Sequence, residues 1–163
     1  MMHHDSYLST AKRHLHVCQL MLSNWVPSNS SENYKSSVIY YLSGYIFEGI
    51  VNYAVCSIVN WTGKSVYQLD TPLVVFKKRS YSDNRLELHR HKYSETIELI
   101  YTHNPQLETK VNNLFVKYGS KRLFNSWSSS YRYKKFDQWN NINDVVNYLN
   151  FCSDFYVLVR NSI

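Results

Sequence analysis

Arginine and histidine are the residue types in this chain whose spacing could support a reaction. Cleavage of RNA without a metal needs a base near the 2′-hydroxyl and a cation near the charge that develops on the phosphate. A His and an Arg one or two helical turns apart can supply both. Arg85 and His91 are separated by five residues and are the candidate catalytic pair. About one such pair is expected by chance in a chain of this composition, so a solvated basic loop is the alternative interpretation.

A carboxylate lies inside the most apolar run of the chain, YYLSGYIFEGIVNYAVCSIV. A buried carboxylate must meet a hydrogen-bond donor or reach solvent, and Arg132 or a tyrosine hydroxyl is the donor that we expect for Glu48. A structural ion pair is one interpretation. The other is a polar groove in which Glu48, Tyr45, Arg132 and Tyr133 bind a ligand or a partner.

Metal binding and nucleophilic catalysis find less support. His14 and Cys18 are four residues apart, but a zinc site needs three or four converging ligands, and we expect no metal. Cys18 and Cys152 are expected in the core, and no Cys carries the surrounding signature of a nucleophile. The four glycines are scattered, which excludes a Gly-rich phosphate loop, and we expect no cofactor.

Two basic, aromatic stretches are candidates for contact with nucleic acid: KKRSYSDNRLELHRHK and KRLFNSWSSSYRYKK. Lys and Arg neutralise phosphates, while Tyr and Trp faces stack on bases. Arg132, between Tyr131 and Tyr133, fits that pattern. The alternative is that Tyr131 and Trp127 pack in the core and the Lys side chains are solvated. The net charge of +6 favours an acidic partner such as nucleic acid.

The elements that must position these residues are helices. A chain of 163 residues fits a single domain, here 1–163, and three prolines leave few breaks. Apolar residues recur at three and four positions through most of the chain, which is helical spacing. The predicted fold is an all-α, antiparallel up-down bundle of four to five helices. We expect the helices over about 6–25 and 32–61, in a short segment that ends at His103, from Pro105 to just before Gly119, and over about 144–163, capped by Asn141 or Asn143.

Gly44 predicts a close contact within this bundle. A glycine in an otherwise apolar helix lets the backbone of another helix approach, so we expect a helix crossing at Gly44. No apolar run is long enough to span a bilayer, and the first residues, MMHHDSYLSTAKRH, lack the apolar centre of a signal peptide. Three cysteines, an odd number, suggest reduced thiols. We therefore expect a cytoplasmic protein without a membrane partner.

The second predicted helix resembles the HEPN family (higher eukaryotes and prokaryotes nucleotide-binding), a family of helical bundles. Members often carry a phrase like YLAGYALECLLKA, and this chain reads YLSGYIFEGIVNY. The shared residues are Tyr41, Leu42, Gly44, Tyr45 and Glu48. The chain departs at Asn52, where the family commonly has Lys. The later phrases HRHKYSETIELI and SYRYKKF resemble the start of the family's third helix and the Arg-Tyr pair before its last helix.

The resemblance implies functions of different kinds. Many members are ribonucleases of toxin or defence systems, with Arg, four to six residues and then His near the start of the last long helix. Others lack that motif and partner a small nucleotidyltransferase, or bind nucleotides or RNA. No His follows His103, so we predict a non-catalytic module that binds a nucleotidyltransferase-type protein, a nucleotide or RNA, and that forms a homodimer. A metal-independent HEPN endoribonuclease and a structural protein-interaction bundle are the alternatives.

Overall fold

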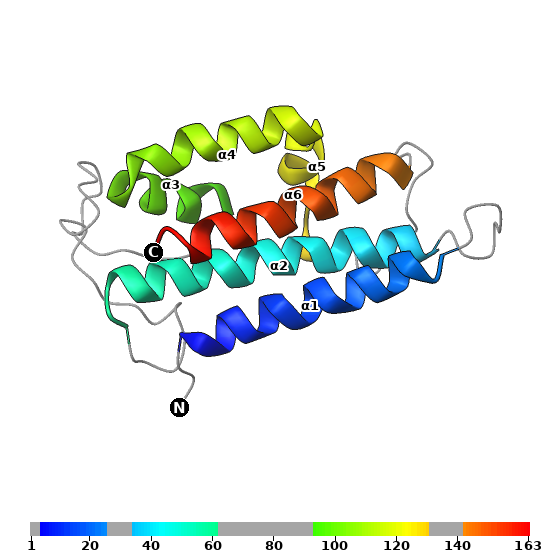
Figure 1. Cartoon of the computed structure of the whole chain (residues 1–163), viewed down its shortest axis with the longest axis horizontal. Coiled ribbons are helices and arrows are strands. Elements are labelled where there is room, and N and C mark those ends of the chain that lie inside the picture. The colour runs from blue at the N-terminus through cyan, green and yellow to red at the C-terminus, as the bar shows by residue number, and fades with distance from the viewer. Residues whose placement is uncertain (1–3, 26–33, 62–92, 131–141) are drawn as a thin grey trace.

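A computed structural model describes residues 4–25, 34–61, 93–130 and 142–163 of the chain. These residues form six α-helices and no strand (Figure 1), so the predicted all-α class is confirmed for the part of the chain described. No helix among them is both long enough and apolar enough to cross a membrane. The helices are α1 (Asp5–Ser23), α2 (Tyr34–Ile58), α3 (Tyr93–His103), α4 (Pro105–Tyr118), α5 (Lys121–Ser126) and α6 (Ile142–Arg160).

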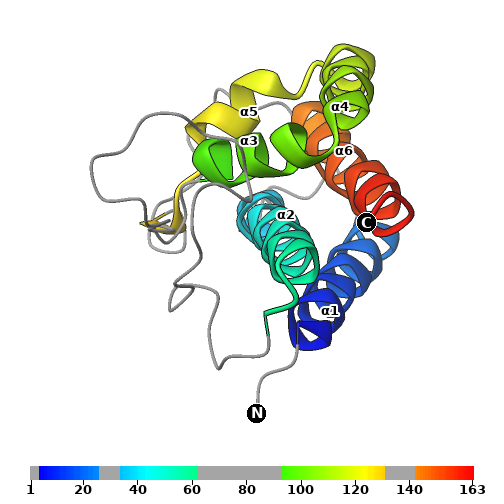
Figure 2. The ribbon, with the colours of Figure 1, turned by 90° about the vertical axis from the view of Figure 1, so that its left-hand side faces the viewer.

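Helix α2 is the central element of the fold. It contacts α1, α3 and α6, which lie on different sides of it (Figure 2). Fifteen of its 25 residues are buried, and a helix that is apolar on most of its circumference needs neighbours on several sides. Helix α2 therefore lies at the centre of the described helices.

Helices α1 and α2 run in opposite directions. His4, at the start of α1, lies 5.8 Å from Tyr53, near the end of α2, between ring centroids. Further along α1, the Cys18 Sγ lies 3.9 Å from the carbonyl oxygen of Ile39, near the start of α2. The two contacts fix an antiparallel pair, as the short connection between the helices predicts.

Helices α2 and α6 run in the same direction, which differs from a strict up-down order. The rings of Tyr40 and Tyr148 are 5.4 Å apart, and those of Phe47 and Phe155 are 4.3 Å apart. Phe47 lies seven residues after Tyr40, and its partner Phe155 lies seven residues after Tyr148. The two helices therefore run in the same direction. The physical reason is that α4 carries the chain back to the end of the molecule at which α2 begins, so α6 starts from that same end (Figure 1).

Phenylalanine side chains from four helices form the aromatic core. Phe115 of α4 stacks on Phe151 of α6 at 4.5 Å and meets Phe124 of α5 edge-on at 5.1 Å. Phe124 also lies edge-on to Phe47 of α2, at 4.9 Å. This packing explains α5, a helix that the sequence pattern did not predict. Six residues are too few to make a stable helix alone, and the ring of Phe124 packs α5 against the core.

A tyrosine of α2 also holds α5. The hydroxyl of Tyr40 donates a hydrogen bond to the carbonyl oxygen of Leu123, at 2.7 Å, and Tyr40 is fully buried. Leu123 is among the last four residues of α5, whose carbonyl groups have no partner within a helix. The side chain from α2 therefore supplies a hydrogen bond that the short helix cannot make for itself.

The ends of α4 agree with their predicted signals. Pro105 occupies the first turn, and Gly119 follows the last residue with φ of 59°, in the left-handed region that favours glycine. The N–H of Ser120 then donates to the carbonyl oxygen of Phe115 at 3.3 Å. The boundaries of α1, α2 and α6 differ from the predicted ones by one to three residues, which is ordinary fraying at helix ends.

Candidate functional site

Four of the five residues that resemble the HEPN phrase share one face of α2. Tyr41, Gly44, Tyr45 and Glu48 follow one another at three and four positions, which places them on one side of the helix. Tyr41 and Tyr45 are half-buried, whereas Glu48 is only 9% exposed. The face is therefore partly open to solvent at its two tyrosines and closed at its carboxylate.

Gly44 accommodates the side chain of Trp127, which follows α5. A Cβ atom placed on Gly44 would lie 1.9 Å from Cε2 of the indole, so no side chain fits there unless Trp127 moves. The indole N–H donates to the carbonyl oxygen of Tyr41 at 3.1 Å, and Trp127 is 7% exposed. The expectation that a helix backbone approaches α2 at Gly44 is wrong. The close neighbour is an indole ring.

The helix crossing occurs at Gly49 instead. A Cβ atom placed there would lie 3.0 Å from both the Ala11 Cβ and the carbonyl oxygen of Tyr7, so the backbone of α1 lies directly against it. Gly44 and Gly49 are five residues apart, and at 3.6 residues per turn they point to different sides of α2. One glycine therefore serves the packing of two helices, and the other serves a side-chain contact.

Three aromatic rings meet around Gly44. Tyr45 stands edge-on to Tyr41, with centroids 4.9 Å apart, and edge-on to Trp127, at 5.3 Å. The Tyr41 hydroxyl donates to the Tyr45 hydroxyl at 3.2 Å. We call Tyr41, Tyr45 and Trp127 the α2 aromatic cluster. Tyr45 is one of the predicted site residues, and Trp127 was expected either in the core or in contact with bases. The contact between Trp127 and Tyr41 was not predicted, because nothing in the spacing of the sequence links the two residues.

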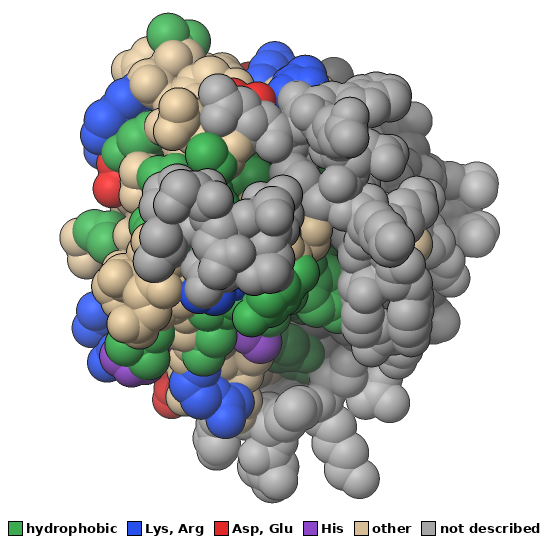
Figure 3. All heavy atoms as spheres, turned by 90° about the vertical axis from the view of Figure 1, so that its right-hand side faces the viewer, with side chains coloured by type: hydrophobic (Ala, Val, Ile, Leu, Met, Phe, Trp, Pro, Cys, Tyr) green, Lys and Arg blue, Asp and Glu red, His purple; other side chains and the backbone are tan. Residues whose placement is uncertain are grey.

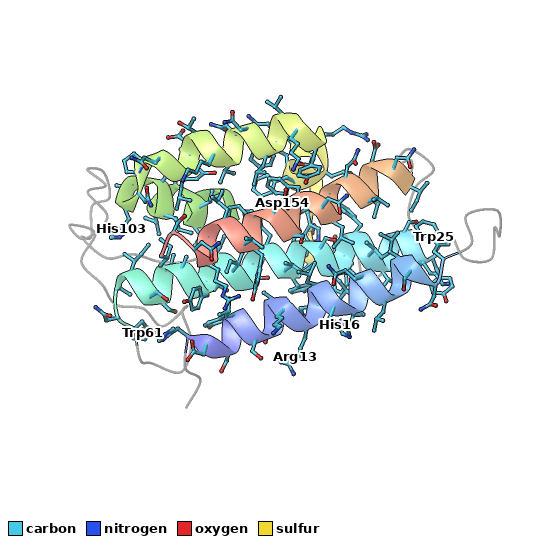
Figure 4. The ribbon with its side chains drawn as sticks, viewed as in Figure 1. Arg13, His16, Trp25, Trp61, His103 and Asp154 are labelled. Atoms are coloured by element: carbon cyan, nitrogen blue, oxygen red, sulfur yellow. The ribbon has the colours of Figure 1, made fainter. Side chains whose placement is uncertain are left out.

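A histidine of α1 borders the cluster. The ring of His14 lies 6.0 Å from that of Tyr45. Burial, with a smaller contribution from the charge of Arg13, lowers the pKa of His14 below its ordinary value of 6.5, so its imidazole is uncharged at neutral pH. Arg13 itself is exposed and, like His16, points away from the helical bundle (Figure 4).

The buried carboxylate lies one turn beyond the cluster. Glu48 is followed four residues later by Asn52, which is 6% exposed, and both residues are engaged by other groups of the protein. Arg132, the predicted partner of Glu48, lies outside the described residues. Tyr133 and the candidate catalytic pair, Arg85 and His91, lie outside them too. Of the predicted site residues the structure therefore brings together Tyr45 and Glu48.

Two of the cysteines lie in the core. Cys18 and Cys152 are fully buried, as predicted. Burial raises the pKa of Cys18 to about 12 and the pKa of Cys152 well above its ordinary value, so neither thiol ionises at neutral pH. Within the four described stretches, no three His, Cys, Asp or Glu side chains lie close enough to hold a metal ion.

A comparison of the chain with protein-family models found no match, and searches of curated proteins and of solved structures found none either. The relationship to the HEPN family therefore remains a prediction that depends on the residues of α2 and on the two later phrases.

Proposed function

We propose that this chain is a non-catalytic HEPN-like module that binds a nucleotidyltransferase-type protein, a nucleotide or RNA in a toxin–antitoxin or defence context. The observation that carries the proposal is the arrangement of Tyr41, Gly44, Tyr45 and Glu48. The two tyrosines of this face pack against the core and are half-buried, so part of each ring is in contact with solvent. With Glu48 they place two aromatic rings beside a carboxylate, which is a composition typical of ligand sites.

The composition of α6 supports a non-catalytic role. Ribonucleases of the family carry Arg and His near the start of the last long helix. Helix α6 contains no His, and the chain has no His after His103. The candidate pair Arg85 and His91 precedes α3 in the chain and so cannot supply that helix with the motif.

Exposed apolar side chains support a protein partner. Val17 and Leu20 on α1 are 42% and 49% exposed, and Tyr34 at the start of α2 is 60% exposed. The two helix ends are adjacent, because Lys35 Nζ donates to the carbonyl oxygen of Asn24 at 3.1 Å. Figure 3 views this end of the molecule, where hydrophobic side chains alternate with basic ones. Such a surface suits a homodimer or a protein partner in the cytoplasm.

The experiment combines binding and cleavage. Labelled single-stranded RNA and ATP are titrated with the purified protein in EDTA, and the chain is co-expressed with a small nucleotidyltransferase. We expect at least one of these ligands to bind without RNA cleavage, and Tyr45→Ala to weaken the binding. Tyr53→Ala is the matched control, since Tyr53 is also a half-buried tyrosine of α2 but packs against His4.

Two results would overturn the proposal. Cleavage of RNA in EDTA would replace it with a metal-independent ribonuclease. If the protein binds none of the three ligands, the structural protein-interaction bundle would replace the proposal.

A further inference from the structure

Helix α1 has one side that is exposed to solvent. The helix contacts α2 and α6 and lies at the edge of the described helices (Figure 2). Exposed residues recur along it at three and four positions, which places them on the same side of the helix. We call the following set the α1 outer face: Lys12, Arg13, His16, Val17 and Leu20.

The C-terminal part of the α1 outer face is apolar. Val17 and Leu20 are three residues apart, so their side chains form one ridge. Of the five exposed large hydrophobic side chains in the described residues, Val17, Leu20 and Tyr34 lie at this end of the molecule. They are therefore gathered in one place, and exposed apolar side chains that are gathered among polar ones mark a contact surface.

The preceding part of the α1 outer face is basic. Neither Lys12 nor Arg13 takes part in an ion pair with another described residue, and the Arg13 guanidinium donates a hydrogen bond to the Thr10 hydroxyl at 3.2 Å. Asp5 is the acidic residue of α1 and lies seven positions before Lys12. The face therefore carries positive charge without a carboxylate to balance it, and a partner with carboxylates complements it.

The spacing along α1 suits a helical partner. Lys12 and Arg13 precede Val17 and Leu20 by one to two turns, which is about 6–12 Å along the helix axis. A second helix that places apolar side chains against Val17 and Leu20 carries its own residues over Lys12 and Arg13 at the same distance. Such a partner needs apolar residues at three and four positions, with Asp or Glu one to two turns away.

Two other occupants match the α1 outer face less well. Single-stranded RNA gains from phosphate contacts and from stacking, but Val17 and Leu20 supply neither, and no Tyr, Trp or Phe belongs to the face. A second copy of this chain, bound through the same face, would bring the positive side chains of both copies into one interface with no carboxylate on the face to oppose them.

We propose that the α1 outer face binds an acidic, amphipathic helix of a protein partner. Val17 and Leu20 contact the apolar side chains of that helix, while Lys12 and Arg13 pair with its carboxylates. The inference rests on the proposed function for the existence of a protein partner, and it adds the place and the chemistry of the contact.

The test uses two synthetic peptides that differ in charge. Each has about 15 residues, enough for a partly formed helix, with Leu at helical spacing and with either Glu or Gln at the positions between. Anisotropy of the labelled peptide measures its binding to the full chain at low salt, where exposed charges are least screened. We expect the Glu peptide to bind about 2- to 30-fold more tightly, the factor for two exposed ion pairs. Equal binding of the two peptides, or binding of neither, would overturn the proposal.

A charge-reversed variant assigns the binding to α1. Lys12→Glu combined with Arg13→Glu should lose the preference for the Glu peptide and should prefer a third peptide, in which Lys replaces Glu. Lys110→Glu combined with Lys121→Glu changes the net charge equally at exposed positions of α4 and α5 and should keep the preference of the parent. Circular dichroism checks that both variants retain their helices. A control that also reverses its preference would assign the effect to net charge and overturn the proposal.

A second variant tests the apolar part of the face. Leu20→Ser should weaken the Glu peptide roughly 4- to 15-fold, for the loss of one or two buried CH₂ groups. Val116→Ser is the matched control, since Val116 is 83% exposed on α4, and it should bind like the parent. Unchanged binding by Leu20→Ser would show that charge alone holds the peptide, which contradicts the proposed contact.

A titration with RNA separates this inference from the proposed function. If single-stranded RNA binds the parent, is lost from the Lys12→Glu, Arg13→Glu variant and is not displaced by the Glu peptide, the face is an RNA surface. That result overturns the inference and leaves the proposed function in place. If the Glu peptide binds as expected while RNA, ATP and the nucleotidyltransferase all fail to bind, the proposed function fails and the contact with an acidic helix stands.

Discussion

Gly44 and Gly49 are five residues apart on α2, and the surroundings of the two glycines differ in kind. At Gly49 the neighbour is the backbone of α1, represented by the Tyr7 carbonyl oxygen and by Ala11. At Gly44 the neighbour is the indole of Trp127, a side chain from a distant part of the sequence. The first contact joins two long helices and leaves no room between them. The second holds a ring against a helix while the adjacent tyrosines stay half-buried.

The difference shows that one residue type makes two kinds of packing contact. A backbone neighbour can shift only if a whole helix shifts, so the Gly49 contact is a fixed part of the core. The Gly44 contact is with one side chain, whose indole is 7% exposed and is held by its hydrogen bond to the Tyr41 carbonyl oxygen. The Gly44 contact therefore depends on the position of one ring, whereas the Gly49 contact depends on the position of a whole helix.

The largest effect is expected from Trp127→Ala. The indole is 7% exposed and fills the space above Gly44, and removal of a buried Trp costs about 3–5 kcal/mol of the free energy of unfolding. Chemical denaturation measures this change. A loss below about 1 kcal/mol, which is the size of an ordinary surface substitution, would show that Trp127 does not hold the Gly44 side together.

Gly44→Ala is expected to have the next largest effect. The new Cβ would lie 1.9 Å from the indole, so the ring must leave its position, at a net cost of about 1–3 kcal/mol despite the gain in helix propensity. Tryptophan fluorescence should shift to longer wavelength as the ring meets water. In the Trp127→Ala background the same change should cost nothing, because the clash is gone. Equal costs in the two backgrounds would contradict the contact.

Gly49→Ala is the matched change on the other side of α2, and we expect a smaller effect. Its Cβ would meet Ala11 and the Tyr7 carbonyl oxygen at 3.0 Å, so α1 must shift by a few tenths of an ångström. Helix propensity offsets part of that cost, which leaves a net change within about 1 kcal/mol of zero. Thermal melts compare the two alanine variants, and a larger loss for Gly49→Ala would reverse the comparison.

The smallest effect is expected from the titration of His14. Its pKa is lowered in the folded protein, so the unfolded chain binds the proton more readily. The stabilisation from a neutral His14 is present above pH 6.5, the ordinary pKa, and decreases as the pH falls below that value. His14→Gln should flatten the pH dependence of stability in that range. An unchanged pH dependence in His14→Gln would contradict the assignment.

Local pattern predicted most of the helices, but not the contacts between them. The periodicity of apolar residues located α1, α2, α4 and α6, and Pro105 and Gly119 marked both ends of α4. Helix α5 was missed because its six residues hold less than two turns, which is too short for a period to be recognised.

The candidate site was predicted only for residues that are close to one another in sequence. Tyr45 and Glu48 could be paired because they lie on one helix. Trp127 and Tyr41 are 86 residues apart, and no spacing rule relates residues so distant. The shared direction of α2 and α6 was missed for a similar reason, since it depends on the path that the chain takes through α4.

Two hydrogen bonds between α2 and the α5 segment are reciprocal. Tyr40 of α2 donates to the carbonyl oxygen of Leu123, and Trp127 donates to the carbonyl oxygen of Tyr41. Neighbouring residues of α2 thus act as donor and as acceptor for a segment too short to be helical alone. The two elements therefore belong to one cooperative unit, and the amides of α5 should exchange with solvent at rates close to those of α2, far more slowly than a six-residue surface turn would.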